Sequence, residues 1–281
     1  MTTNSDLTRL DASLEGVAAG TVIPYLGPGV AALGTGSFPA APQALCERIE
    51  AEIRVPKRAH GNLWSAAQYV ESRKFRATLD DIVQRAFDGA SGVNPIARWV
   101  AAQRPPLVVD AWYDSALLDA YRSGGAGTWG WVQGVSRNGE WTLIWTKAYA
   151  ADGTERLEGA DPDWTSLVYK PHGLARKGSS FLMSDSDYVE VLTEIDIQSP
   201  IPDEVIRRRT GRGFLYLGCR FDDQMLRTFA RQISKRSGGP QVAVIEGSLS
   251  RMEARFLSEN GITRIDLPLA EVAKRLDAVP A

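Results

Sequence analysis

Histidine is the side chain best suited to acid–base chemistry near neutral pH, because its ordinary pKa lies close to that range. The chain contains two histidines, His60 and His172, so any histidine-dependent chemistry has two candidates. His172 comes shortly after the apolar run 167–170 and precedes a glycine, whereas His60 lies in the charged stretch 57–62 with no predicted strand before it. We therefore predict that His172 lies in a functional pocket. A loop histidine satisfied by hydrogen bonds is the alternative.

A glycine pair near the N-terminus offers a second kind of chemistry. Gly27, Pro28 and Gly29 follow the apolar run 22–26, which predicts a short strand. Glycines let the backbone approach a phosphate, and the N–H groups beyond them can point at it. With Ala32 in the third glycine position, the segment matches only the loose form of the dinucleotide-binding pattern, and it is not a Walker A loop. An ordinary turn at the end of a strand is the alternative.

Composition limits the possible classes of protein. The 281 residues are 44% hydrophobic and 23% charged, as in a globular protein with a substantial core. The net charge of −2 argues against a general nucleic-acid partner. No apolar run reaches the ~18 residues that cross a membrane, and the polar N-terminus argues against a signal peptide. We expect a cytoplasmic protein.

The cysteines give no sign of a metal site or a disulfide. Cys46 and Cys219 are the only two, and they lie far apart in the sequence. Two cysteines cannot form a four-cysteine zinc site, and a disulfide is not indicated in a cytosolic context. We expect Cys219 to be a small buried residue rather than a nucleophile.

The hydrophobic pattern predicts an α/β fold. From Leu167 onward, predicted strands and helices alternate with mostly short links, which favours a Rossmann-like parallel sheet covered by helices on both faces. Ligands in such sheets bind at the carboxyl ends of the strands. We expect one shared crevice there, formed by the segments 27–30, 110–114, 171–173, 218–220 and 246–248.

Two insertions are predicted within a single domain of residues 1–281. The first, 39–104, reads as a helical insert. The second, 124–165, is rich in glycine and tryptophan and predicts a β-hairpin insert, with strands at 129–135 and 141–147 and a turn at 137–139. A basic cluster, Arg207–Arg209 with Arg212, is expected in a loop as a solvated face or as a contact for an acidic partner.

Taken in order, the segments at the strand ends resemble those of the sirtuin-like NAD-binding proteins of prokaryotes, which commonly act as NAD-cleaving effectors in phage defence. The resemblance covers roughly residues 18–268. The family opens with Gly-Ala-Gly-x-Ser and continues with Thr-Thr-Asn-Tyr-Asp, His-Gly, Thr-Glu-x-Asp-Tyr and Gly-x-Ser/Gly-x-x-Asp. The matching segments here are Gly27-Pro28-Gly29-Val30-Ala31, Asp110-Ala111-Trp112-Tyr113-Asp114, Lys170-Pro171-His172-Gly173, Ser184-Asp185-Ser186-Asp187-Tyr188 and Gly218-Cys219-Arg220-Phe221-Asp222.

The resemblance implies roles for particular residues. NAD is the implied substrate or ligand, and His172 is the implied general base. Asp114 is implied to cap a helix or to support the first loop. Glu246 is implied to bind the adenine-side ribose, with a plain surface charge as the alternative. The implied NAD-binding residues are Gly27, Pro28, Gly29, Val30, Trp112, Asp114, Gly218, Cys219 and Glu246.

Three positions depart from the family pattern. Trp112 replaces the asparagine that helps to bind the nicotinamide ribose and to position the attacking water. In the phosphate loop, Pro28 replaces an alanine and lacks an N–H group, and Ala31 replaces a serine. Trp112 either stacks on a nicotinamide or adenine ring, or fills the nicotinamide pocket and blocks NAD.

The resemblance therefore implies an NAD glycohydrolase that uses His172. A catalytically inactive module that binds a nucleotide or a protein is the alternative, because of Trp112. A zinc-ribbon sirtuin deacylase is not expected, since that class needs four cysteines in two C-x-x-C pairs. Expected partners are NAD or a related nucleotide, with a separate protein or further copies of the chain as the trigger.

Overall fold

A nine-stranded sheet forms the centre of the protein and combines a parallel core with an antiparallel edge. The computed structural model describes residues 3–124, 127–136, 145–194 and 201–276. The strand bounds are Val22–Leu26 (β1), Leu107–Asp110 (β2), Trp129–Gly134 (β3), Thr146–Ala150 (β4), Glu155–Arg156 (β5), Ser166–Lys170 (β6), Gly213–Leu217 (β7), Gln241–Val244 (β8) and Thr263–Ile265 (β9). Their order is β5-β4-β3-β6-β2-β1-β7-β8-β9, and all neighbours from β3 to β9 pair in parallel. The predicted α/β fold is confirmed.

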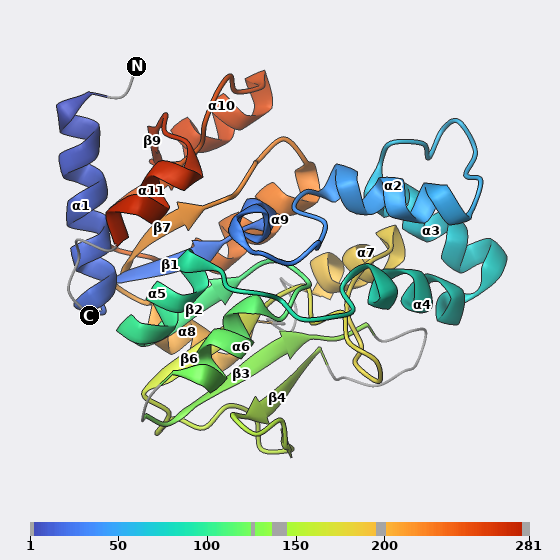
Figure 1. Cartoon of the computed structure of the whole chain (residues 1–281), viewed down its shortest axis with the longest axis horizontal. Coiled ribbons are helices and arrows are strands. Elements are labelled where there is room, and N and C mark those ends of the chain that lie inside the picture. Colours follow the sequence, from blue (N-terminus) through green and yellow to red (C-terminus); the bar gives the residue numbers. More distant parts are fainter. Residues whose placement is uncertain (1–2, 125–126, 137–144, 195–200, 277–281) are drawn as a thin grey trace.

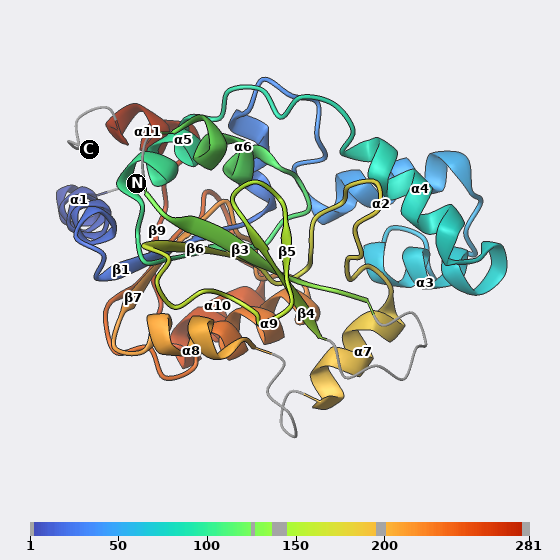
Figure 2. The same ribbon diagram turned by 90° about the horizontal axis from the view of Figure 1, so that it is seen from below.

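Helices cover both faces of this sheet (Figure 1). The helix bounds are Asn4–Ala18 (α1), Pro28–Leu33 (η1, a 3-10 helix), Pro42–Glu52 (α2), Leu63–Lys74 (α3), Arg76–Ala86 (α4), Pro95–Gln103 (α5), Ala116–Ser123 (α6), Asp185–Glu194 (α7), Asp203–Arg209 (α8), Gln224–Ser234 (α9), Arg251–Glu259 (α10) and Leu269–Leu276 (α11). Figure 2 shows α5, α6 and α11 on one side of the sheet, and α8, α9 and α10 on the other. None of the helices in the described ranges is both long and apolar enough to cross a membrane.

Burial of the central strands explains their composition. Every residue of β1, β2, β6 and β7 is buried, as expected for parallel strands with helices on both faces. The apolar residues of these strands divide between two clusters, one for each face of the sheet. α9 presents Leu226, Phe229, Ala230 and Ile233 at helical spacing, so one stripe of this helix packs on the sheet.

The Trp-rich region extends the main sheet at one edge. β3 pairs in parallel with β6, and β4 pairs antiparallel with β3, so that Gly134 lies opposite Thr146. An antiparallel pair is thus present, and the described part of its second strand is Thr146–Ala150. The predicted turn at 137–139 and most of the predicted strand 141–147 lie outside the described residues.

The region 39–104 contains four α-helices with two different positions. Helices α2, α3 and α4 contact one another and form a group beside the sheet (Figure 1). Helix α5 instead packs against α6 and α11 on one face of the sheet. The group α2–α4 contacts the main fold through α3, which packs against α7, and through Arg76 of α4, which pairs with Asp187 of α7.

The prediction for the basic cluster at 207–212 is wrong as to the loop and as to two of its arginines, although Arg207 is exposed. Arg207, Arg208 and Arg209 lie in α8 rather than in a loop, and Arg208 and Arg209 are each only 5% exposed. Arg208 donates to the carbonyl groups of Pro106 and Trp164, and Arg209 donates to the last carbonyls of α9. These hydrogen bonds to backbone carbonyls compensate for the burial of the two guanidinium groups.

Candidate functional site

His172 lies just beyond the carboxyl end of β6 and is enclosed by aromatic rings. Its side chain is 1% exposed. The ring centroids of Phe229, Tyr188 and Tyr113 lie 4.8, 5.6 and 6.2 Å from that of the imidazole. Burial, with a smaller effect from the nearby Lys170 ammonium, lowers the pKa of His172 to about 3. The imidazole is therefore neutral at physiological pH in this closed conformation. A general base must be unprotonated but also needs a pKa nearer neutrality, which access of water to the ring would restore.

The two ring nitrogens of His172 have different surroundings. Nδ1 lies 3.0 Å from the hydroxyl oxygen of Tyr188. Nε2 is buried and has no hydrogen-bond partner among the described residues. Because buried polar atoms are rarely left unpaired, Nε2 is a position at which a water or a ligand hydroxyl would gain a hydrogen bond.

Lowering the pH is expected to destabilise the protein through His172. The pKa of this group is about 3 in the folded state and about 6.5 in the unfolded chain, so between these values the unfolded state binds more protons. The free energy of unfolding therefore falls as the pH drops below about 6.5, by about 2 kcal/mol at about pH 5 from this histidine alone.

Chemical denaturation at about pH 8 and about pH 5 measures this difference. His172→Asn is expected to lose this part of the pH dependence. His60→Asn, which removes a histidine whose side chain is 69% exposed, is expected to retain it. The raised pKa of Asp110 has the opposite effect, because it makes the free energy of unfolding rise as the pH drops. This contribution is present in all three proteins and cancels when their pH dependences are compared. An identical pH dependence in the wild type and in His172→Asn would contradict the expectation.

The start of α7 holds Tyr188 against the imidazole. Asp187, the residue before it, accepts hydrogen bonds from the backbone N–H groups of Met183 and Ser184 at 2.8 and 3.1 Å. Arg76, the first residue of α4, forms an ion pair with Asp187 at 2.7 Å. The group α2–α4 therefore fixes the first turn of α7, and with it the position of Tyr188.

A buried lysine joins the loop after β2 to the end of β6. The Nζ atom of Lys170 lies 2.6 Å from Oδ2 of Asp110, and it donates to the carbonyls of Trp112 and Asp114 at 2.7 and 2.9 Å. All three ammonium donors are thus satisfied. Burial raises the pKa of the Asp110 carboxyl to about 6 in spite of the opposing Lys170 charge, so this group is still ionised at neutral pH. Tyr113, between the two carbonyls, is held in place.

In this conformation, the Trp112 side chain packs inside the protein and its hydrogen-bond donor is paired with a backbone carbonyl. Its side chain is 1% exposed, and its Nε1–H group donates to the carbonyl of Pro39 at 2.7 Å. Its ring centroid lies 5.0 Å from that of Tyr113 and 5.9 Å from that of Phe87. The indole therefore fills space between the loop after β2 and the region 39–87. The carboxylate of Asp114 accepts a hydrogen bond from the N–H of Ala116, the first residue of α6 and two positions along the chain, as in an Asx turn just before the helix.

The glycine loop after β1 directs its N–H groups at protein atoms. Gly27 N–H donates to the last carbonyl of β7 at 2.8 Å, Gly29 N–H to the Gly218 carbonyl at 2.8 Å, and Val30 N–H to the Gly27 carbonyl at 3.1 Å. Pro28 has no N–H group. A Cβ atom on Gly27 would lie 2.6 Å from the Gly218 carbonyl oxygen, so the two loops touch. These three N–H groups are not available to a phosphate in this conformation.

The remaining predicted residues lie on the β7 and β8 side. Cys219 is 5% exposed, and burial raises the pKa of its thiol, which makes it a small buried residue rather than a nucleophile. Its neighbour Arg220 pairs with the buried Glu253 at 2.7 Å. Hydrogen bonds from Arg220 and from backbone N–H groups outweigh burial and lower the pKa of Glu253 to about 2. Glu246 is exposed and has no hydrogen bond or ion pair among the described residues.

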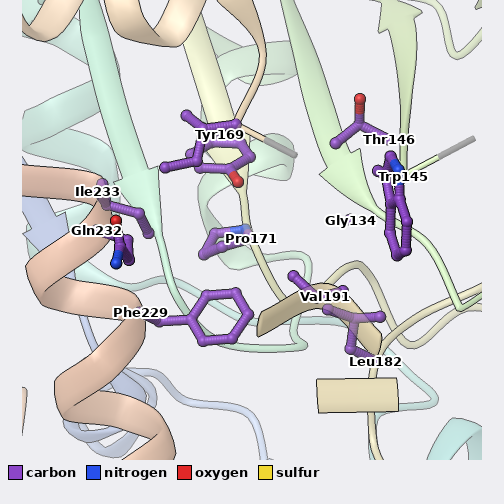
Figure 3. A pocket seen from close by; sticks show the side chains of 11 residues that line it. Gly134, Trp145, Thr146, Tyr169, Pro171, Leu182, Val191, Phe229, Gln232 and Ile233 are labelled. Carbon is purple, nitrogen blue, oxygen red and sulfur yellow. The ribbon is translucent and has the colours of Figure 1, made fainter. Parts of the chain in front are cut away.

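A small pocket lies beside the rings that enclose His172 (Figure 3). Its volume is about 10 Å³, which is room for about one water molecule. Phe229, whose ring contacts the imidazole, points into it from α9, opposite Leu182 and Val191. This pocket is too small to admit a nucleotide without a change in conformation.

A larger pocket lies between α4, α6 and the segment that follows His172. Its volume is about 540 Å³, a size typical of small-molecule sites. Phe87, which lines it, also contacts Trp112, so this ring lies between the pocket and the indole. Arg176 and Lys177 at its rim are exposed and have no ion pair among the described residues. The same lining also carries Asp81, Asp88 and Asp119, of which Asp81 pairs with Arg85 and Asp119 with Arg122.

The structure brings the predicted site residues together in two groups. His172, Trp112 and Asp114 lie on loops that Lys170 connects, and Gly27–Val30 lie against Gly218 and Cys219. Glu246 belongs to neither. Lys170, Tyr113 and Tyr188 lie within the recognised sequence motifs, but no role was predicted for them. A lysine that ends an otherwise apolar buried strand was the available signal, because such a charge needs a partner.

The comparisons with known proteins agree with this arrangement. A family model for the SIR2-like domain matches residues 106–265, more than half of the chain. The match includes β2, β6 and β7 with their loops, but it does not reach the glycine loop at 27–30. No curated protein matches the chain. Within the described ranges, no three histidine, cysteine, aspartate or glutamate side chains converge as metal ligands would.

Proposed function

Because the chain belongs to the family of proteins with a SIR2-like domain, we propose that it hydrolyses the bond between nicotinamide and ribose in NAD, with His172 as general base. SIR2-like domains bind NAD in general. The observation that carries the proposal is the state of His172: a neutral imidazole, anchored through Nδ1, with a buried and unpaired Nε2. An effector role in phage defence, and the trigger for it, stay predictions.

The proposed reaction needs one proton acceptor and no acid. The bond between ribose C1′ and the nicotinamide nitrogen breaks, and its electron pair stays on that nitrogen, so nicotinamide leaves as a neutral molecule. Water adds to C1′ and gives a proton to Nε2 of His172, which passes it to solvent. The products are nicotinamide, ADP-ribose and a proton. The enclosing rings of Tyr113, Tyr188 and Phe229 limit the water that reaches C1′.

Binding of NAD at His172 requires a conformation more open than the one described. Phe87 lines the large pocket and contacts both Trp112 and Tyr113, and Trp112 is bonded to the Pro39 carbonyl. We propose that the nicotinamide end enters from this pocket when the segment that carries Pro39 moves away. Arg176 and Lys177 at the rim suit the pyrophosphate, whereas the N–H groups at 27–30 do not serve it in the present conformation.

A second candidate function is a nucleotide- or protein-binding module without turnover. Two observations favour it: the buried indole of Trp112, and the internal hydrogen bonds of the glycine loop. Both would be expected if the ancestral NAD crevice had been filled by side chains and closed. In this function His172 is a structural residue of the core.

Incubation of the full chain with NAD, with chromatographic detection of nicotinamide and ADP-ribose, tests the enzyme proposal. We expect equal amounts of the two products. Calorimetric titration with NAD, under the same conditions, separates the two functions. Binding with no product formed, or no binding at all, contradicts the hydrolase. Binding of NAD without turnover supports the module.

A further inference from the structure

Two tyrosines connect His172 to a backbone carbonyl through a series of hydrogen bonds. The geometry points to a role for these bonds in placing the imidazole proton. We propose that Tyr113 and Tyr188 are positioning residues that hold the imidazole proton on Nδ1, so that Nε2 of His172 carries a free lone pair. The series of hydrogen bonds runs from the Leu182 carbonyl through both phenol hydroxyls to the imidazole. The catalytic consequence rests on the proposed NAD hydrolysis, but the position of the proton does not.

Each phenol hydroxyl has one proton, and this determines which atom donates in each hydrogen bond of the series. The Tyr113 hydroxyl lies 2.8 Å from the Leu182 carbonyl oxygen, which can only accept, so Tyr113 donates its proton there. The contact of 3.0 Å between the two hydroxyls must then use the proton of Tyr188. Tyr188 has no second proton for its 3.0 Å contact with His172, so Nδ1 of the imidazole must be the donor.

The opposite tautomer leaves two defects in the same space. If Tyr188 donated to Nδ1, the two hydroxyls would lose their mutual hydrogen bond, and the proton on Nε2 would face a buried environment without an acceptor. A buried unpaired group costs about 1–3 kcal/mol. The proposed direction satisfies every donor and leaves only the Nε2 lone pair unpaired. That lone pair is the atom that a general base uses.

Further hydrogen bonds hold the residues that form this series in place. The backbone carbonyl of Tyr113 accepts a hydrogen bond from the Ala175 N–H at 3.0 Å. Leu182, whose carbonyl ends the series, donates its own N–H to the His172 carbonyl at 2.9 Å. Tyr188 follows Asp187, whose carboxylate accepts hydrogen bonds from the backbone N–H groups of Met183 and Ser184. The acceptor, both hydroxyls and the imidazole are therefore fixed relative to one another by backbone contacts.

Nuclear magnetic resonance of the full chain with isotopically labelled histidine tests the proposal. With two histidines, spectra of His60→Asn identify the signals of His172. We expect the proton of His172 on Nδ1 in the wild type at neutral pH. In Tyr113→Phe, Tyr188 loses its acceptor, so either tautomer leaves one buried donor unpaired, the Tyr188 hydroxyl or the Nε2–H group. The preference for Nδ1 is then lost, and a mixture of the two tautomers is expected. Tyr121→Phe, which removes an equally buried hydroxyl on the other face of the sheet, is expected to leave the proton on Nδ1.

The wild-type spectrum alone can overturn the proposal, even if Tyr113→Phe does not fold. A proton on Nε2, or a mixture of both tautomers, in the wild type would overturn it. So would an unchanged tautomer in a folded Tyr113→Phe protein. If the protein hydrolyses NAD, Tyr113→Phe is also expected to lower kcat by at least about 2-fold with little change in KM, because Nε2 then carries the proton in part of the molecules. A protein with no NAD hydrolysis but with the expected tautomers would refute the proposed function and leave this inference standing.

Discussion

Replacing His172 by asparagine is expected to lower the rate of nicotinamide release from NAD by about 10²- to 10⁴-fold, the usual contribution of a general base. An amide cannot take a proton from water at neutral pH. Asparagine is still able to bond to the Tyr188 hydroxyl, which lies 3.0 Å from Nδ1 in the wild type. The substitution therefore removes the base with the least change to the enclosing rings. Steady-state measurement of nicotinamide release gives kcat and KM for both proteins.

The matched control for this variant is His60→Asn, which changes an exposed histidine in the same way. We expect its kcat to equal that of the wild type. Circular dichroism and a thermal transition establish that His172→Asn is folded. A folded His172→Asn protein that keeps the wild-type rate would remove His172 from the mechanism.

Replacing Lys170 by methionine is expected to lower the free energy of unfolding by about 3–5 kcal/mol, the usual cost of removing one partner of a buried ion pair. Methionine has a similar length but no charge or donor. The variant leaves the Asp110 carboxylate, buried at 5% exposure, without its cation. It also leaves the carbonyls of Trp112 and Asp114 without their donor. Urea denaturation measures the change.

Two further variants separate the cost of leaving a buried charge unpaired from the cost of losing any lysine. Lys147→Met breaks the half-exposed pair with Glu155, where we expect a loss of about 0–1 kcal/mol. Adding Asp110→Asn to Lys170→Met removes the orphaned charge, so the double variant is expected to be more stable than Lys170→Met alone. A loss for Lys170→Met no larger than that for Lys147→Met would show that the buried pair does not hold these loops.

Much of the fold was predictable because a parallel strand that is buried on both faces consists of a nearly continuous run of apolar residues. The apolar runs that became β1, β2, β6 and β7 were recognisable, and so were the segments after them. The basic cluster was mistaken for a solvated face. A run of arginines normally indicates solvent, and nothing local shows that Arg208 and Arg209 are to satisfy carbonyls on distant elements.

The amino-acid sequence by itself determined the order of the elements, the set of loops at the carboxyl edge and the place of His172 among them. Local patterns carry this information, because periodicity and turn residues act over a few neighbours. Only the tertiary structure decided the state of the site. The partners of Nδ1, the burial of Trp112 against Pro39 and the closure of the glycine loop on Gly218 join residues 16 to more than 180 positions apart. Hydrogen-bond direction and pKa depend on such contacts, and no local pattern encodes them.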